Sequence, residues 1–169
     1  AGSGKGEFAA VAERADVPVV TMGDVIRAEC RERGLDPAEH HGEVASALRE
    51  ERGPAAIAEA SLPHVETALE DADTVVVDGI RSDVEVDAFE ERFGEAFALV
   101  GIEAPFEVRR ERIDDRGRDD VENGEALAAR DERELGFGLG AALDRADVTI
   151  ENTGTLGAFR ERVREVLEG

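Results

Sequence analysis

The stretch Gly2-Ser3-Gly4-Lys5 stands at the start of a segment with helical periodicity, residues 5–14. Glycines let backbone amides converge on an anion, and the amino terminus of a helix adds its dipole. Lys5 is the only lysine among 20 basic residues, so its compact ammonium meets a need that arginine does not fill. The stretch predicts the closing half of a phosphate-binding loop, with Lys5 reaching the β- and γ-phosphates of a nucleotide. The alternative is a flexible Gly/Ser remnant, which the matches further along the chain disfavour.

The residues after Lys5 depart from the usual form of such a loop, because Gly6 and Glu7 stand where Ser or Thr is typical. No hydroxyl is then available for Mg²⁺ at this point. Asp78 closes the run Thr74-Val75-Val76-Val77-Asp78, the clearest buried strand in the sequence. We therefore expect Asp78 to hold the metal, directly or through water. The alternative is a turn residue ahead of Gly79.

Apolar runs and helical patterns alternate along the chain, as in βαβ units around a parallel sheet that is covered on both faces. Strands are expected at residues 17–20, 74–78, 97–102 and 148–151. Helices are expected at 5–14, 23–33, 37–53, 55–71, 83–92, from 105, around 125–134 and at 156–167, with a mobile or tightly turned loop at 136–140. The last helix should bury Leu156, Phe159, Val163 and Leu167. These segments predict one three-layer α/β/α domain over residues 1–169.

The first strand of that sheet is expected to precede this sequence. The spacing G-x-x-x-x-G-K places the first glycine of the loop two residues before Ala1, with the strand ahead of it. That strand should lie centrally, between the strand that ends at Asp78 and the strand at about 97–102. With the central first strand missing, the 169 residues should show two pairs of strands on either side of an open slot.

Aspartate and glutamate total 41 against 20 lysine and arginine residues, a formal net charge of −21. Such a charge repels free nucleic acid and anionic membranes, so we expect neither as a partner. An acidic, lysine-poor surface is typical of a salt-rich cytosol, where screening reduces self-repulsion; an ordinary acidic protein from a GC-rich genome is the alternative. Because no leader or long apolar run is present, we expect a cytoplasmic protein. Cys30, the only cysteine, is expected to be a small buried helix residue rather than a catalytic thiol.

Together these features resemble the adenylate-kinase and dephospho-CoA-kinase branch of P-loop NTPases, over nearly the whole chain. Within that branch the sequence looks most like an archaeal, halophilic-type family of nucleotide-kinase-like ATP-binding proteins. Gly4-Lys5-Gly6 resembles the adenylate-kinase form of the loop, which has threonine where this chain has Glu7. The resemblance implies a nucleotide kinase-like fold, with ATP and Mg²⁺ as cofactors.

Two segments resemble the acceptor side of that branch. Thr21-Met22-Gly23-Asp24-Val25-Ile26-Arg27 is similar to the acceptor-binding segment, in which the arginine at the position of Arg27 contacts the acceptor's phosphate. Asp78-Gly79-Ile80-Arg81 is similar to the Asp-Gly-x-x-Arg segment, although its arginine comes one residue early. The resemblance implies acceptor-binding helices at about 23–72 and the following contacts: Gly23, Asp24, Arg27, Asp78, Gly79 and Arg81.

Three further segments resemble the ATP side. Residues 105–116 are similar to the helix that enters the lid of these kinases, and Gly124-Glu125-x-Leu127-x-x-Arg130-Asp131 is similar to the segment that leaves it, so the lid is short, about 116–124. Ile150-x-Asn152-x-Gly154-Thr155 resembles the dephospho-CoA-kinase ending, whose loop lies against adenine. Catalytic roles are expected for Lys5, Asp78, Arg112, Arg116 and Arg130. ATP contacts are expected from Gly2, Ser3, Gly4, Lys5, Gly6, Glu7, Asn152 and Gly154.

The arginines of this region fit the chemistry, because phosphoryl transfer needs positive charge around the phosphate oxygens. Arg109, Arg110, Arg112, Arg116 and Arg118 crowd one short stretch of an otherwise acidic chain. The alternative, a helix surface with alternating Arg–Glu pairs, covers Arg109, Arg110 and Arg118. The histidines have no metal-ligand spacing with Cys30 and are expected at the surface: His40, His41 and His64.

The function these features predict is a kinase that moves the γ-phosphate of ATP to a small nucleotide-like acceptor, either a nucleoside monophosphate or dephospho-CoA. A second hypothesis is a regulatory switch that binds or hydrolyses ATP without a small-molecule acceptor, because Glu7 removes the hydroxyl ligand. A kinase acting on another class of metabolite is a third.

Overall fold

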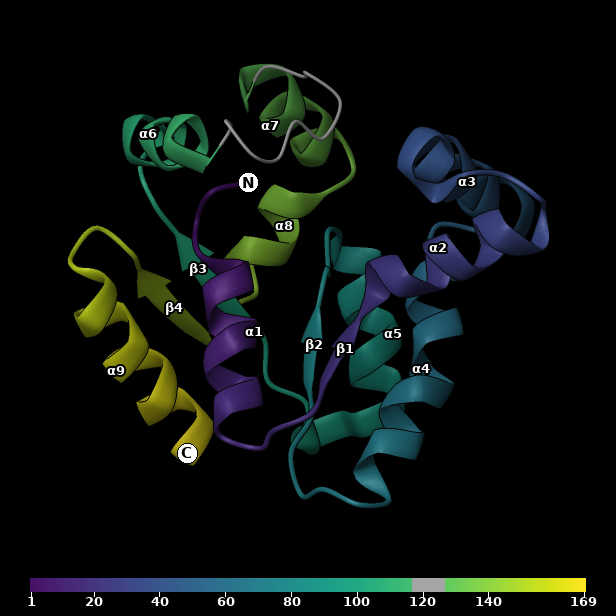
Figure 1. Ribbon diagram of the computed structural model, residues 1–169. Helices are drawn as coiled ribbons and strands as arrows, with labels where there is room; N and C mark the ends of the chain where they lie inside the picture. Colours follow the sequence, from purple (N-terminus) through teal and green to yellow (C-terminus); the bar gives the residue numbers. More distant parts are fainter. Residues whose placement is uncertain (117–126) are drawn as a thin grey trace.

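The structure is a computed structural model that describes residues 1–116 and 127–169, with Arg116 described by its backbone alone. Helices and short strands alternate along it (Figure 1). The elements in order are α1 (Lys5–Arg14), β1 (Val19–Thr21), α2 (Met22–Glu32), α3 (Pro37–Arg52), α4 (Ala56–Leu69), β2 (Val76–Asp78), α5 (Asp83–Phe93), the 3₁₀ turn η1 (Gly94–Ala96), β3 (Val100–Glu103), α6 (Phe106–Arg116), α7 (Leu127–Gly136), α8 (Leu139–Asp144), β4 (Val148–Glu151) and α9 (Leu156–Glu168). The expected α/β alternation is confirmed. The lid expected at 116–124 and Arg118 lie outside the described residues.

One helix was not predicted. The glycine-rich residues 136–140 were expected to form a loop, but only Phe137 and Gly138 connect α7 to α8. Gly138 has φ +102 and caps the start of α8, so a glycine that looked like part of a loop allows one helix to follow another directly.

The strands form two separate parallel pairs. β1 pairs with β2, with Val19 opposite Val76, and β3 pairs with β4, with Val100 opposite Val148. A cavity of about 910 Å³ lies between β2 and β3 and is lined by both strands. The predicted arrangement of two strand pairs on either side of an open slot is therefore confirmed. A first strand that pairs with β2 and β3 there stays a prediction.

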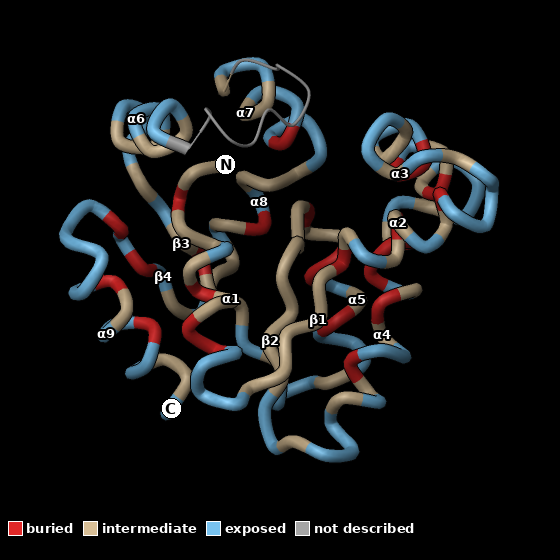
Figure 2. Tube along the Cα trace, in the orientation of Figure 1, coloured by how far each residue is buried: buried red, intermediate tan, exposed pale blue. Residues whose placement is uncertain are grey.

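Two apolar clusters hold these layers together. One joins α2, α3, α4 and α5 and includes Met22 and the fully buried Cys30, as predicted. The other packs α1 and α9 against β3 and β4. Figure 2 shows the buried positions on the inner sides of these helices. The prediction for Leu156 is wrong: at the first turn of α9 it is 53% exposed, whereas Phe159 and Val163 are buried.

The outer helix faces carry the acidic excess, with Glu43, Glu50 and Glu91 among the exposed residues. Within the described part of the chain, no helix has the length and apolar character needed to cross a membrane.

Stability is expected to rise from dilute buffer to molar KCl, because salt screens the repulsion among exposed carboxylates. The measurement is Tm by scanning calorimetry across a KCl series. As a control, the same series at about pH 4, where many carboxylates are neutral, should show a smaller rise. A Tm that stays flat or falls at neutral pH would count against a salt-adapted surface.

Candidate functional site

The segment before α1 has the backbone of a phosphate-binding loop. Gly2 and Gly4 have φ of +75 and +123, which side-chain-bearing residues rarely adopt. A Cβ at Gly4 would also lie 2.6 Å from Nδ2 of Asn152 and 3.1 Å from the ring of Phe159. Glycine is therefore required at position 4 by conformation and by space, and the loop leads directly into the first turn of α1.

Two predicted site residues hold this loop in place, Asn152 from the expected ATP contacts and Arg112 from the expected catalytic set. Asn152, the residue after β4, is buried and donates from Nδ2 to the carbonyl of Ser3 at 2.8 Å. Arg112 of α6 donates to the carbonyl of Asn152 at 2.8 Å and to that of Gly2 at 3.4 Å. The structure thus brings Arg112 and Asn152 to the phosphate loop, but with these donors bonded to protein oxygens.

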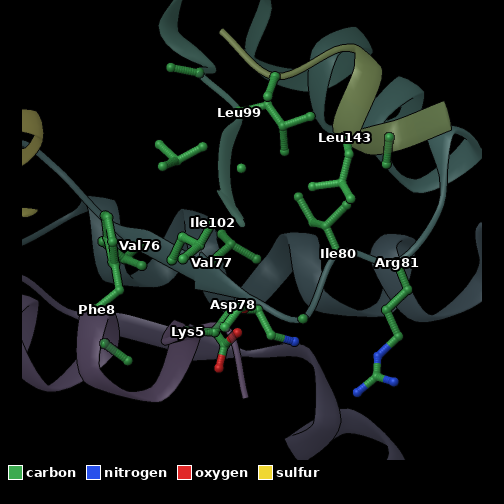
Figure 3. A pocket seen from close by; sticks show the side chains of 18 of the residues that line it. Lys5, Phe8, Val76, Val77, Asp78, Ile80, Arg81, Leu99, Ile102 and Leu143 are labelled. Atoms are coloured by element: carbon green, nitrogen blue, oxygen red, sulfur yellow. The ribbon is translucent and has the colours of Figure 1, made fainter. Parts of the chain in front are cut away.

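Lys5 is the first residue of α1 and lies beside Asp78 at the end of β2 (Figure 3). Burial lowers the pKa of Lys5 and repulsion by Arg81 lowers it further, while Asp78 and Glu134 act in the opposite direction. A phosphate bound here would favour the charged ammonium. The lysine and the carboxylate predicted from separate motifs are therefore neighbours.

Arg81 is fixed at both its backbone and its side chain. Its N–H donates to Oε2 of Glu85 at 2.7 Å, and its Nη1 donates to Oε1 of Glu134 at 2.8 Å. Arg130 donates from Nε to the same Oε1 at 3.3 Å. Glu134, on α7, is only 3% exposed. The structure therefore unites Arg81, Arg130 and Lys5, three predicted site residues, around a carboxylate that was not predicted.

Burial favours the neutral form of Glu134, yet the charges around it lower the pKa of this carboxyl below its usual value. Within the folded chain, Arg81, Lys5 and Arg130 supply such charges. Glu134 is thus a buried carboxylate surrounded by cations.

Glu85 on α5 accepts the backbone N–H of Arg81. This residue was also not predicted as part of the site. Its side chain is 1% exposed, and burial raises its pKa against the N–H of Arg81 and the charge of Arg49. Arg49 of α3 lies 3.7 Å from Glu85 and places its guanidinium 5.0 Å from the ring centre of Phe137. The helix predicted to bind the acceptor is therefore connected to the loop that carries Arg81.

Arg109 joins α6 to α7 through a bidentate pair with Asp131, at 2.8 and 2.7 Å. These hydrogen bonds lower the pKa of Asp131. From the sequence, Arg109 and Arg110 could belong either to the phosphate site or to Arg–Glu pairs on a helix surface. Arg109 belongs to the site region, whereas Arg110 pairs with Glu107 one turn away on the surface of α6.

The acceptor segments also meet in space. Gly79 has φ +117, and a Cβ there would lie 3.2 Å from Cβ of Met22, so the turn after β2 abuts the start of α2. A Cβ at Gly23 would lie 3.2 Å from Nη1 of Arg27. Arg27 pairs with Asp24 at 2.9 Å and is 40% exposed, so its guanidinium stands at the protein surface.

Glu7 is placed away from the phosphate loop. It accepts from Nε of Arg160 on α9 at 2.6 Å and from Arg14 at 3.4 Å, and the hydrogen bond from Arg160 lowers its pKa. A Cβ at Gly6 or at Gly154 would meet no atom within 4 Å. Glu7 is therefore engaged with α9 and the end of α1, whereas the ATP contacts expected from Gly6 and Gly154 stay predictions.

The loop, the lysine and the acid at the end of the neighbouring strand define a P-loop nucleotide-binding domain with a nucleotide kinase-like fold. A family model described as an AAA domain matches residues 1–128. A UPF0200 protein of Halobacterium salinarum is 59% identical over 166 residues, which cover 98% of this chain and 87% of that protein. UPF0200 proteins of Methanosarcina mazei and Methanoregula boonei are each 46% identical, over 98% of this chain and 88% and 90% of their own lengths.

The chain belongs to the AAA domain family that this model describes and to the family of UPF0200 proteins. The resemblance to an archaeal family with a halophilic member is confirmed.

Proposed function

We propose that this P-loop domain is a kinase that transfers the γ-phosphate of ATP to a small nucleotide-like acceptor, a nucleoside monophosphate or dephospho-CoA. The observation that carries the proposal is that the predicted ATP site and the predicted acceptor segment adjoin each other. Lys5 lies beside Asp78, and Asp78 is followed by Gly79, which abuts the start of the acceptor segment at Met22. A donor phosphate on Lys5 would therefore face an acceptor held by α2.

The chemistry fits the charges in this region. The transferred phosphoryl group needs positive charge on its oxygens rather than a strong nucleophile from the protein. Lys5, Arg81 and Arg130 would supply that charge, with Arg112 and Arg109 positioning the loop and α7. Arg116 retains its proposed role at the entry to the lid.

Asp78 fits Mg²⁺, which prefers carboxylate oxygen and commonly binds through one or two protein carboxylates, water and substrate phosphates. Among residues 1–116 and 127–169, no group of three or more His, Cys, Asp or Glu side chains could hold a metal by itself. This agrees with a metal that is held largely by the nucleotide and supplies positive charge to its phosphates.

A coupled ATP-consumption assay in molar KCl tests the proposal, with AMP, CMP, dUMP and dephospho-CoA offered in turn. Turnover that one acceptor stimulates is the expected result. The competing function is an ATP-dependent switch, favoured because Glu7 stands where a hydroxyl ligand for Mg²⁺ is typical and pairs through Oε1 with Arg160 of α9. Tight ATP binding, together with ATP consumption that no acceptor stimulates, would instead support the switch.

Arg27→Ala is expected to raise the KM of the acceptor about 10–100-fold while the Kd of ATP stays within about twofold, because the proposal places Arg27 at the acceptor's phosphate and not at ATP. A hydrogen bond to a charged group contributes about 1.5–3 kcal/mol, which corresponds to this range. The measurements are acceptor KM in the coupled assay and ATP Kd by calorimetry.

Arg31→Ala is the matched control, since Arg31 is exposed one turn further along α2. It should leave both constants unchanged. An Arg27→Ala variant that weakens ATP and acceptor binding equally would show that the acceptor site is wrongly assigned.

A further inference from the structure

The carboxylate of Glu134 is bound by cations that the proposed site would use to hold a phosphate. Its Oε1 accepts from Arg81 and Arg130, and Glu134 lines the same cavity as Lys5 and Arg81. Lys5 contributes to the same electrostatic cluster. Lysine and arginine side chains are groups that bind nucleotide phosphates.

A carboxylate among cations that bind phosphate is unfavourable for ATP binding, because Glu134 and the phosphates are both negatively charged. The carboxylate is 3% exposed, so water screens its charge poorly. A phosphate bound to Lys5 and Arg81 would therefore repel it strongly. The two anions compete for the same cations, and one must leave when the other binds.

We propose that Glu134 is an internal competitor of the nucleotide's phosphates. In the ligand-free protein it pairs with Arg81 and Arg130 and keeps both arginines inside the site; when a nucleotide binds, the phosphates displace it. The inference rests on the proposed nucleotide site and adds its regulation. Because Glu134 is on α7, its displacement moves this helix relative to the loop after β2, while Arg109 and Asp131 hold α7 to α6.

The test compares Glu134→Gln with Glu132→Gln in the full chain, with ATP and inorganic tripolyphosphate as probes, by titration calorimetry in molar KCl. Glu132 is on the same helix but exposed, so both variants remove one negative charge from α7. Glu134→Gln is expected to bind each probe at least about tenfold more tightly than the unmodified protein, a change of about 1.4 kcal/mol. Glu132→Gln should stay within about twofold.

A purely structural ion pair predicts the opposite sign, because loss of Glu134 would loosen the arginines and weaken binding. Unchanged or weaker binding by Glu134→Gln therefore overturns the inference. Thermal melting gives a second readout: Glu134→Gln should have a lower Tm without ligand, because two arginines lose their partner, and a larger rise in Tm on adding ATP.

If Glu134→Gln does not fold, Glu134→Asp carries the same comparison. Its shorter carboxylate reaches the arginines less well and should bind ATP at least about threefold more tightly, which is roughly 0.65 kcal/mol; unchanged binding overturns the inference. If the unmodified protein binds neither probe, the proposed function fails with it. If that protein binds ATP and the variants bind no more tightly, only the role of Glu134 fails.

Discussion

Lys5→Arg is expected to lower the turnover number at least a hundredfold while the Kd of ATP stays within about tenfold. Positive charge is retained, so attraction to the phosphates survives. Geometry does not survive, because Lys5 lies beside Asp78 and a planar guanidinium cannot place one compact charge there without displacing the loop. Misalignment of the reacting groups affects turnover more than binding.

The measurements are turnover number in the coupled assay and Kd of ATP by calorimetry. Arg164→Lys is the control: Arg164 is exposed on α9, and the reverse exchange there should change neither value. Arg160 is unsuitable for this purpose, because its side chain pairs with Glu7. If Lys5→Arg retained more than about a tenth of normal turnover, a loss under about 1.4 kcal/mol, the phosphate role of Lys5 would be refuted.

Gly4→Ala is expected to weaken ATP binding at least about a hundredfold, or about 2.7 kcal/mol, and to lower the free energy of unfolding. The backbone at position 4 has φ +123, and forcing a residue with a side chain into such a conformation costs about 1–3 kcal/mol. The new methyl group would also lie 2.6 Å from Nδ2 of Asn152, which holds the carbonyl of Ser3. The loop must therefore shift, and its amides no longer converge.

Gly42→Ala is the control, at a glycine outside the phosphate loop. Gly42 is exposed within α3 and a Cβ there meets no atom within 4 Å, so this change should leave ATP binding intact and stabilise the helix by up to about 1 kcal/mol. Calorimetric Kd values and urea unfolding curves measure both effects. Comparable Kd values for the two variants would mean that the conformation of the loop does not determine binding.

Local patterns account for most of what could be predicted. The strand at 148–151 has the bounds expected from its apolar run, and α1, α3 and α9 begin within one or two residues of the predicted positions. The separation into two strand pairs also followed from the sequence, because the spacing of glycine and lysine in a phosphate loop fixes where its preceding strand must lie. The same spacing identified Gly4 and Lys5 as residues of the phosphate loop.

Partners that are distant in the chain could not be predicted. Arg81 and Glu134 are 53 positions apart, and Arg109 and Asp131 are 22 positions apart. Because the chain is rich in both arginine and acidic residues, the sequence offers each of these side chains many possible partners. Only the i, i+4 spacing of Arg130 and Glu134 gave a local signal, and that spacing is equally typical of a surface pair. Glu7 was expected at ATP because of its place in the motif, but it pairs with Arg160 across the contact between α1 and α9.

The sequence by itself determined the phosphate loop, the alternation of helices and strands, and the identities of Lys5 and Asp78, because each depends on residues close together in the chain. The tertiary structure decided which charges meet. Burial of Glu134 among Lys5, Arg81 and Arg130 requires α1, the turn after β2 and α7 to converge, and this convergence turns a helix glutamate into a buried carboxylate that is paired with two arginines of the proposed site.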